Sequence, residues 1–109
     1  MLSARLYLAQ RISALVMAPL VLGHLAVTIV AVRGGLDAAE ILGRTRGSLL
    51  WGGFYGLFVL AVSVHAAIGL RAIVAEHLGL RGRGLDIFTW ATMAGLLLTG
   101  GRAVAAVVL

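Results

Sequence analysis

The sequence predicts an all-α membrane protein with three transmembrane helices, and three observations carry this prediction. Of the 109 residues, 61% are apolar and only 12% are charged, whereas soluble domains are about half apolar and a quarter charged. The apolar residues gather in three runs, 12–32, 49–74 and 87–109, each about as long as the roughly 20 residues that cross a bilayer. The length leaves no room for a second domain, so we expect one membrane domain over residues 1–109.

Cysteine content and charge narrow the possible functions. The chain has no cysteine, which excludes disulfide bonds and thiolate chemistry. Its net charge of +5 comes from nine arginines against four acids. Most of the arginines flank the apolar runs, so we interpret them as topology signals and contacts to lipid headgroups, not as a surface for nucleic acid.

The first apolar run, 12–32, begins directly after Arg11 and is longer than the apolar part of a signal peptide. It contains His24 and Pro19. The proline is expected to kink the helix because it removes one backbone donor. The loop that follows opens with a Gly-Gly turn, and we expect it to carry one short surface helix over 36–42.

The second run, 49–74, contains His65 and, near its end, Arg71. An Arg-Gly-Arg-Gly sequence predicts a second loop over about 75–86, and the third run is interrupted only by Arg102. Five arginines lie on the side of the amino terminus and second loop, against four on the other side. This bias favours a multi-pass protein of the inner (cytoplasmic) membrane with a cytoplasmic amino terminus.

Two imidazoles lie inside the apolar runs, where a polar side chain is costly and needs a reason. A neutral imidazole of His24 or His65 is a good axial ligand for haem iron, and helices of a bundle can present it inward. His65 shares a helical line with Ala61, Gly69 and Ala72, whose small side chains leave room for a flat macrocycle. The alternative interpretation of these histidines and small residues is close helix packing.

The two histidines are expected at different depths. At the helical rise of 1.5 Å per residue, His65 lies about 9 Å from Arg71, and His24 lies about 19 Å from Arg11 on the same side. The imidazoles therefore differ in depth by roughly 10 Å. One haem bound by both would need them level, so they serve two haems or only one of them is a ligand. Either way, the opposite axial ligand comes from another chain.

Two short stretches resemble a known family. His-Ala-Ala-Ile-Gly-Leu-Arg at 65–71, followed by Glu76, resembles the second-helix motif of succinate dehydrogenase and fumarate reductase membrane anchors. That motif has a haem-ligating His, a Gly four residues later, often an Arg at six and an acid at eleven. Gln-Arg-Ile-Ser-Ala at 10–14 is similar to the family's Arg-x-Ser-Gly start of the first helix, with Ala14 in place of Gly. The resemblance implies that the three helices form half of an anchor bundle.

The resemblance also implies cofactors and site residues. It implies haem b, one or two per anchor pair, with His65 as ligand of the haem nearer the cytoplasm, beside Gly69 and Arg71. His24 is similar to the first-helix ligand of two-haem anchors. The residues placed near a quinone pocket or the haem propionates are Tyr7, Arg11, Ser13, Glu76 and His77.

Other interpretations of these residues stay open. The arginines of this set are also placed to reach lipid headgroups. Glu76 is also placed to form an ion pair with Arg71 or Arg81, and His77 could simply be solvated. The type of anchor stays open too, because His77 stands where one type has a tyrosine and Tyr7 stands where the other often has a serine.

The resulting hypothesis is an electron-transfer anchor that is itself not catalytic. It would pass electrons between an iron–sulfur subunit and membrane quinone, with a flavoprotein subunit and a second anchor chain as further partners. One rival is a haem-bearing anchor of another respiratory complex, and another is a haem-free three-helix adaptor. A small transporter is disfavoured, because all four acids lie in expected loops or at helix ends.

Overall fold

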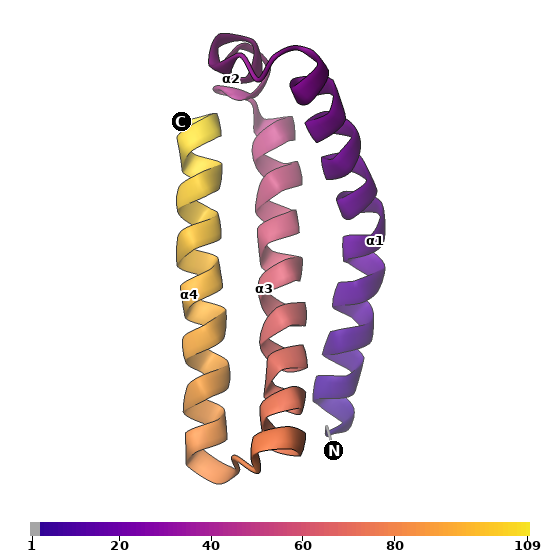
Figure 1. Cartoon of the computed structure of the whole chain (residues 1–109), viewed down its shortest axis with the longest axis vertical. Coiled ribbons are helices and arrows are strands. Elements are labelled where there is room, and N and C mark those ends of the chain that lie inside the picture. The colour runs from indigo at the N-terminus through magenta and orange to yellow at the C-terminus, as the bar shows by residue number, and fades with distance from the viewer. Residues whose placement is uncertain (1–2) are drawn as a thin grey trace.

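The computed structural model describes residues 3–109 as four helices: α1 (Ala4–Arg33), α2 (Ala38–Thr45), α3 (Leu49–Leu78) and α4 (Gly82–Val108). The three long helices lie alongside one another, and α2 sits across one end (Figure 1). All three are long and apolar enough to cross a membrane, and no strand occurs in the described part of the chain. The predicted all-α membrane fold is confirmed.

Each long helix begins or ends outside its apolar run, because local capping signals fix the ends. α1 starts at Ala4 and not at residue 12, since the Ser3 hydroxyl accepts a hydrogen bond from a first-turn amide at 3.3 Å. α3 runs on until Gly79, which has a φ of +68° that glycine adopts without strain. The expected loop over 75–86 therefore shrinks to residues 79–81.

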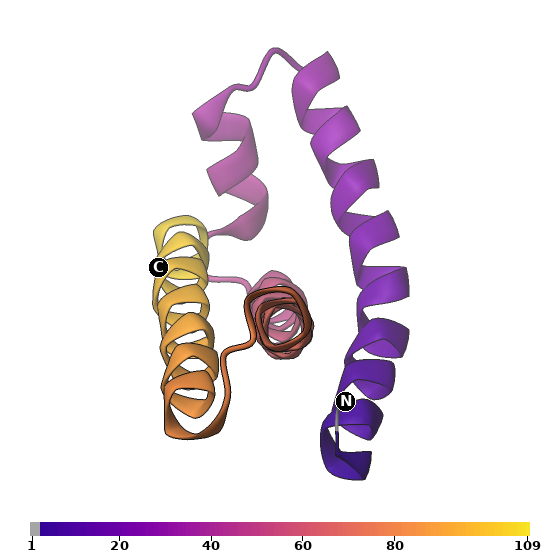
Figure 2. The same cartoon turned by 60° about the horizontal axis from the view of Figure 1, so that its bottom comes forward.

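The middle position belongs to α3, which packs against α1 on one side and α4 on the other (Figure 2). α1 remains one helix across Pro19 and is bowed along its length (Figure 1). Half of the buried residues in the described part of the chain lie on the central helix: Ala61, Ser63, Ala67 and Ile68. The outer faces of α1 and α4 are largely exposed and apolar, as expected for helices that face lipid or another subunit.

The loop between α1 and α3 forms hydrogen bonds with the carboxyl end of α4. Its helix α2 lies slightly later than the expected 36–42 and ends at Thr45, which is fully buried. The Thr45 hydroxyl lies 2.7 Å from the carbonyl oxygen of Val107, and the N–H of Gly47 donates to the Val108 carbonyl at 2.7 Å. The last four carbonyls of a helix have no partner within it, so these bonds satisfy two of them from another element.

Replacing Thr45 by valine is expected to destabilise the chain by about 1–3 kcal/mol, because it leaves a helix-end carbonyl without its donor. The matched control is Thr99→Val, since the Thr99 hydroxyl bonds only carbonyls of its own helix. The measurement is thermal unfolding of the purified protein in detergent. Equal unfolding temperatures for the two variants would contradict a role for Thr45 in holding α4.

Candidate functional site

His65 projects from α3 toward α1, and one of its ring nitrogens is held there. Nδ1 lies 3.3 Å from the hydroxyl oxygen of Ser13 and 3.3 Å from the backbone carbonyl oxygen of Gln10. Ser13 is 5% exposed, so this contact lies inside the helix pair. Within residues 3–109, both hydrogen bonds of the ring use Nδ1, and none uses Nε2.

Gly69 lies one turn after His65 on the same face of α3, and it faces the side chain of Gln10 on α1. A Cβ atom at Gly69 would meet only the side-chain nitrogen of Gln10, at an ordinary 3.5 Å. The side-chain oxygen of the same Gln10 is buried and has no hydrogen-bond partner among the described residues. Packing inside this chain therefore does not require glycine at position 69.

His24 has different surroundings. Its ring packs on Phe58 at a centroid distance of 5.1 Å and edge-on to Tyr55 at 6.2 Å. It borders a largely apolar cavity of about 330 Å³ between α1, α3 and α4, whose other walls include Val59 and Gly100. No hydrogen bond of the His24 ring is found in the described part of the chain. His24 thus has space beside it, but no acceptor that would orient the ring.

The two histidines lie at different levels of the bundle, as the sequence predicted. On α1, His24 follows Ser13, the residue that contacts His65, by eleven residues. On α3, Phe58, which contacts His24, precedes His65 by seven residues. At 1.5 Å per residue these spacings correspond to about 10–17 Å along the helices, so the two imidazoles cannot hold one group between them.

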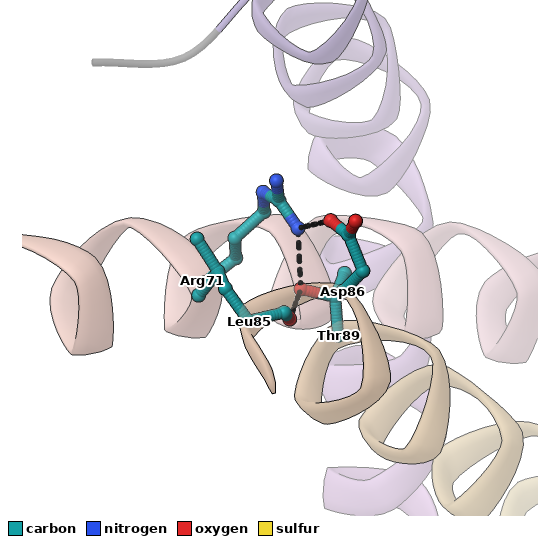
Figure 3. Close-up of polar contacts among 4 residues, drawn as sticks. All are labelled: Arg71, Leu85, Asp86 and Thr89. Atoms are coloured by element: carbon teal, nitrogen blue, oxygen red, sulfur yellow. Dashed lines mark hydrogen bonds and ion pairs between the residues drawn. The ribbon is translucent and has the colours of Figure 1, made fainter. Parts of the chain in front are cut away.

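Arg71 fastens α3 to α4 (Figure 3). Its guanidinium donates to the carboxylate of Asp86 at 2.8 Å and to the hydroxyl of Thr89 at 3.1 Å, and Thr89 in turn donates to the carbonyl of Leu85. The Arg71 side chain is only 21% exposed. Arg71 therefore binds a neighbouring helix, and its ion pair is with Asp86, while none with Glu76 is found among the described residues.

Sequence reasoning missed this contact because it placed Asp86 in a loop over 75–86 and Thr89 in the apolar run that follows, without relating the two. Once α4 begins at Gly82, the two residues lie three positions apart on one helix face. The three-residue spacing of Asp86 and Thr89 was the signal in the sequence that could have predicted a shared partner for them. The short connection after Gly79 brings this face of α4 beside the last turns of α3.

The five residues expected near a quinone do not converge in this chain. Tyr7 and Arg11 are both exposed on α1, with the guanidinium 5.8 Å from the centre of the tyrosine ring. Ser13 is buried beside His65 instead. His77 is exposed in the last turn of α3.

Glu76 is the member of that set that borders a polar cavity. The cavity measures about 230 Å³ and lies where α1 and α4 begin and α3 ends. Arg71 and Arg81 also line it, yet no salt bridge of Glu76 occurs among the described residues. The cavity therefore combines two guanidinium groups with a carboxylate that is not engaged by either of them.

No cluster of three or more His, Cys, Asp or Glu side chains that could hold a metal ion occurs in residues 3–109. The two histidines are separate, and each offers one nitrogen ligand at most to an axial position. A planar metal cofactor held here would thus take its second protein ligand from another chain.

Comparisons with known proteins agree with the sequence motifs. The family described as succinate dehydrogenase/fumarate reductase transmembrane subunit matches residues 2–109. The chain is also 37% identical over 92 residues to the succinate dehydrogenase hydrophobic membrane anchor subunit of Archaeoglobus fulgidus, a match that covers 84% of this chain and 77% of that protein. No solved structure was found to match the chain.

Proposed function

The chain belongs to the succinate dehydrogenase/fumarate reductase transmembrane subunit family, and from this premise we propose that it binds haem b and passes electrons between an iron–sulfur subunit and membrane quinone. The observation that carries the proposal is the different hydrogen bonding of the two ring nitrogens of His65. One ring nitrogen is held by α1, and the other has no protein partner within residues 3–109.

The residues around His65 fit a haem. Metal-bound histidines almost always donate their second ring N–H to a carbonyl, carboxylate or water, and Nδ1 of His65 has such acceptors in Gln10 and Ser13. Gly69, which lies one turn along the same helix face, has only the flexible Gln10 side chain at ordinary contact distance from the place of a Cβ. When bound, haem b supplies one-electron redox chemistry. His65 would hold the haem iron through its free ring nitrogen, and a second anchor subunit would supply the other protein ligand.

His24 is the candidate ligand of a second, outer haem. Its ring borders the apolar cavity of about 330 Å³, and its level in the bundle differs from that of His65 by about 10–17 Å. Support for His24 is weaker than for His65, because no acceptor orients its ring in the described part of the chain. A histidine that only packs against Phe58 and Tyr55 would have the same surroundings.

Quinone chemistry belongs at the opposite end of the bundle from α2. The cavity of Glu76, Arg71 and Arg81 supplies hydrogen-bond donors for quinone carbonyls and a carboxyl group that can transfer protons. In the proposed orientation this end faces the cytoplasm, where the iron–sulfur and flavoprotein subunits dock. The chain itself contributes cofactor ligands and part of the quinone pocket, and dicarboxylate chemistry takes place in the soluble subunits.

The test is a reduced-minus-oxidised absorption spectrum of the complex purified in mild detergent, with haem quantified per copy of this chain. We expect a b-type signal, together with succinate-dependent reduction of an added quinone. One haem per anchor pair would support His65 alone and make His24 a packing residue. Two haems per pair would support both ligands. A complex without a b-type signal would contradict the proposal and leave a haem-free membrane anchor.

A further inference from the structure

We propose that Ser13 is a positioning residue, which together with the Gln10 backbone carbonyl fixes His65 in the tautomer that ligates through Nε2. This inference rests on the proposed haem ligation by His65. It gives Ser13 a role different from the quinone contact that the family resemblance implies. Three observations carry it: the proton balance at Nδ1, the burial of Ser13, and the contrast with the hydroxyls of Ser63 and Thr28.

The proton balance at Nδ1 has one solution for a neutral ring. A backbone carbonyl only accepts hydrogen bonds, so Nδ1 must donate to the Gln10 oxygen 3.3 Å away. The single hydroxyl proton of Ser13 is used in a 2.9 Å bond to the same carbonyl. Ser13 therefore presents a lone pair to Nδ1 at 3.3 Å. With its proton on Nδ1, the neutral imidazole carries its free lone pair on Nε2.

His65 lies in the middle of a membrane-spanning helix, where an unpaired charge is costly. No carboxylate is found within 4.0 Å of the ring among the described residues. No acidic side chain in the described part of the chain therefore competes with Gln10 and Ser13 for the proton on Nδ1.

The hydroxyl of Ser13 differs from those of Ser63 and Thr28, because it contacts the ring of His65 on another helix. The hydroxyls of Ser63 and Thr28, by contrast, bond only a carbonyl four residues earlier in their own helix. Ser13 instead bonds the carbonyl three residues earlier and also reaches a ring on another helix. It is the one buried residue of α1 in the described part of the chain, so the hydroxyl is held at His65 and away from solvent.

Removing the hydroxyl should loosen the ring and weaken its ligation. Partners that orient a metal-bound histidine are typically worth about 10–100-fold in metal affinity. An acceptor at Nδ1 also makes the imidazole a stronger electron donor through Nε2. We therefore expect Ser13→Ala to weaken haem retention about 10–100-fold and to raise the midpoint potential of the haem.

The experiment compares Ser13→Ala, Ser13→Thr and Ser63→Ala in the intact complex. Ser63→Ala is the matched control, because Ser63 is 1% exposed and its hydroxyl bonds only its own helix. The readouts are haem content after detergent washing, the midpoint potential, and the imidazole bands in redox-induced infrared difference spectra. The infrared bands report the hydrogen bond at Nδ1 directly, and loss of helix packing alone would not move them.

The expected result is that Ser13→Ala changes all three readouts, Ser13→Thr restores them, and Ser63→Ala leaves them as in the unmodified complex. Infrared bands and a potential that are the same in Ser13→Ala and Ser63→Ala would overturn the inference while leaving haem ligation by His65 intact. An unmodified complex that contains no haem would overturn the proposed function, and this inference with it.

Discussion

Replacement of His65 by alanine is expected to remove the b-type haem that lies nearer the cytoplasm. The imidazole is the ligand that this chain offers at that level, since His24 lies about 10–17 Å away along the bundle. In a complex with one haem per anchor pair, the reduced-minus-oxidised signal should vanish. In a complex with two, about half should remain, and His24→Ala should remove the other half.

Three controls distinguish loss of the haem ligand from failure of the complex to assemble. His77→Ala changes an exposed histidine at the end of the same helix, and we expect its haem content to equal that of the unmodified complex. Added imidazole should enter the space left in His65→Ala and restore part of the haem signal. Co-purification of the soluble subunits shows that the complex has formed. Full haem content in an assembled His65→Ala complex would rule out His65 as the ligand.

The fold was predictable from the sequence because hydrophobicity alone decides it. Three apolar runs of transmembrane length leave few other arrangements, and the structure contains the three expected helices. The helix ends were harder to predict, since they depend on caps and not on apolar content. Ser3 and Gly79 extend α1 and α3 into polar sequence that a hydropathy pattern assigns to loops.

The contacts of the site were less predictable than its residues. His65 stands out in the sequence as a polar group within an apolar run, but its partner Ser13 is 52 residues away. Only the register between α1 and α3 brings them together, and that register depends on side-chain packing along the whole helix pair. The pairing of Arg71 with Asp86 was missed for a related reason, since it requires α4 to begin four residues before the aspartate.

A pair of glycines allows the same substitution to test two different kinds of contact. At Gly100 on α4, an added Cβ would lie 2.6 Å from a methyl group of Val59, closer than packed atoms approach. We expect Gly100→Ala to force α3 and α4 apart and to destabilise the protein by about 1–3 kcal/mol. At Gly69, an added Cβ meets only the flexible side chain of Gln10 at 3.5 Å.

Gly69→Ala should therefore have the opposite effect on the chain itself. Alanine in a helix interior is more stable than glycine by about 0.5–1 kcal/mol, and no residue of α1 or α4 stands in the way of its Cβ. If a haem lies flat beside His65, the new methyl group points into the space that the macrocycle needs. We thus expect Gly69→Ala to keep or raise the unfolding temperature while lowering haem content.

The measurements are thermal unfolding and haem content of both variants in the same detergent. If Gly69 leaves room for a haem, Gly69→Ala should lower the haem content without lowering the unfolding temperature. Gly100→Ala should lower both. Unchanged haem content in a stable Gly69→Ala complex would mean that no cofactor approaches this turn of α3. His65 would then have to present its free nitrogen to a group on a different face. The substitution thus tests where the cofactor lies, while His65→Ala tests which residue holds it.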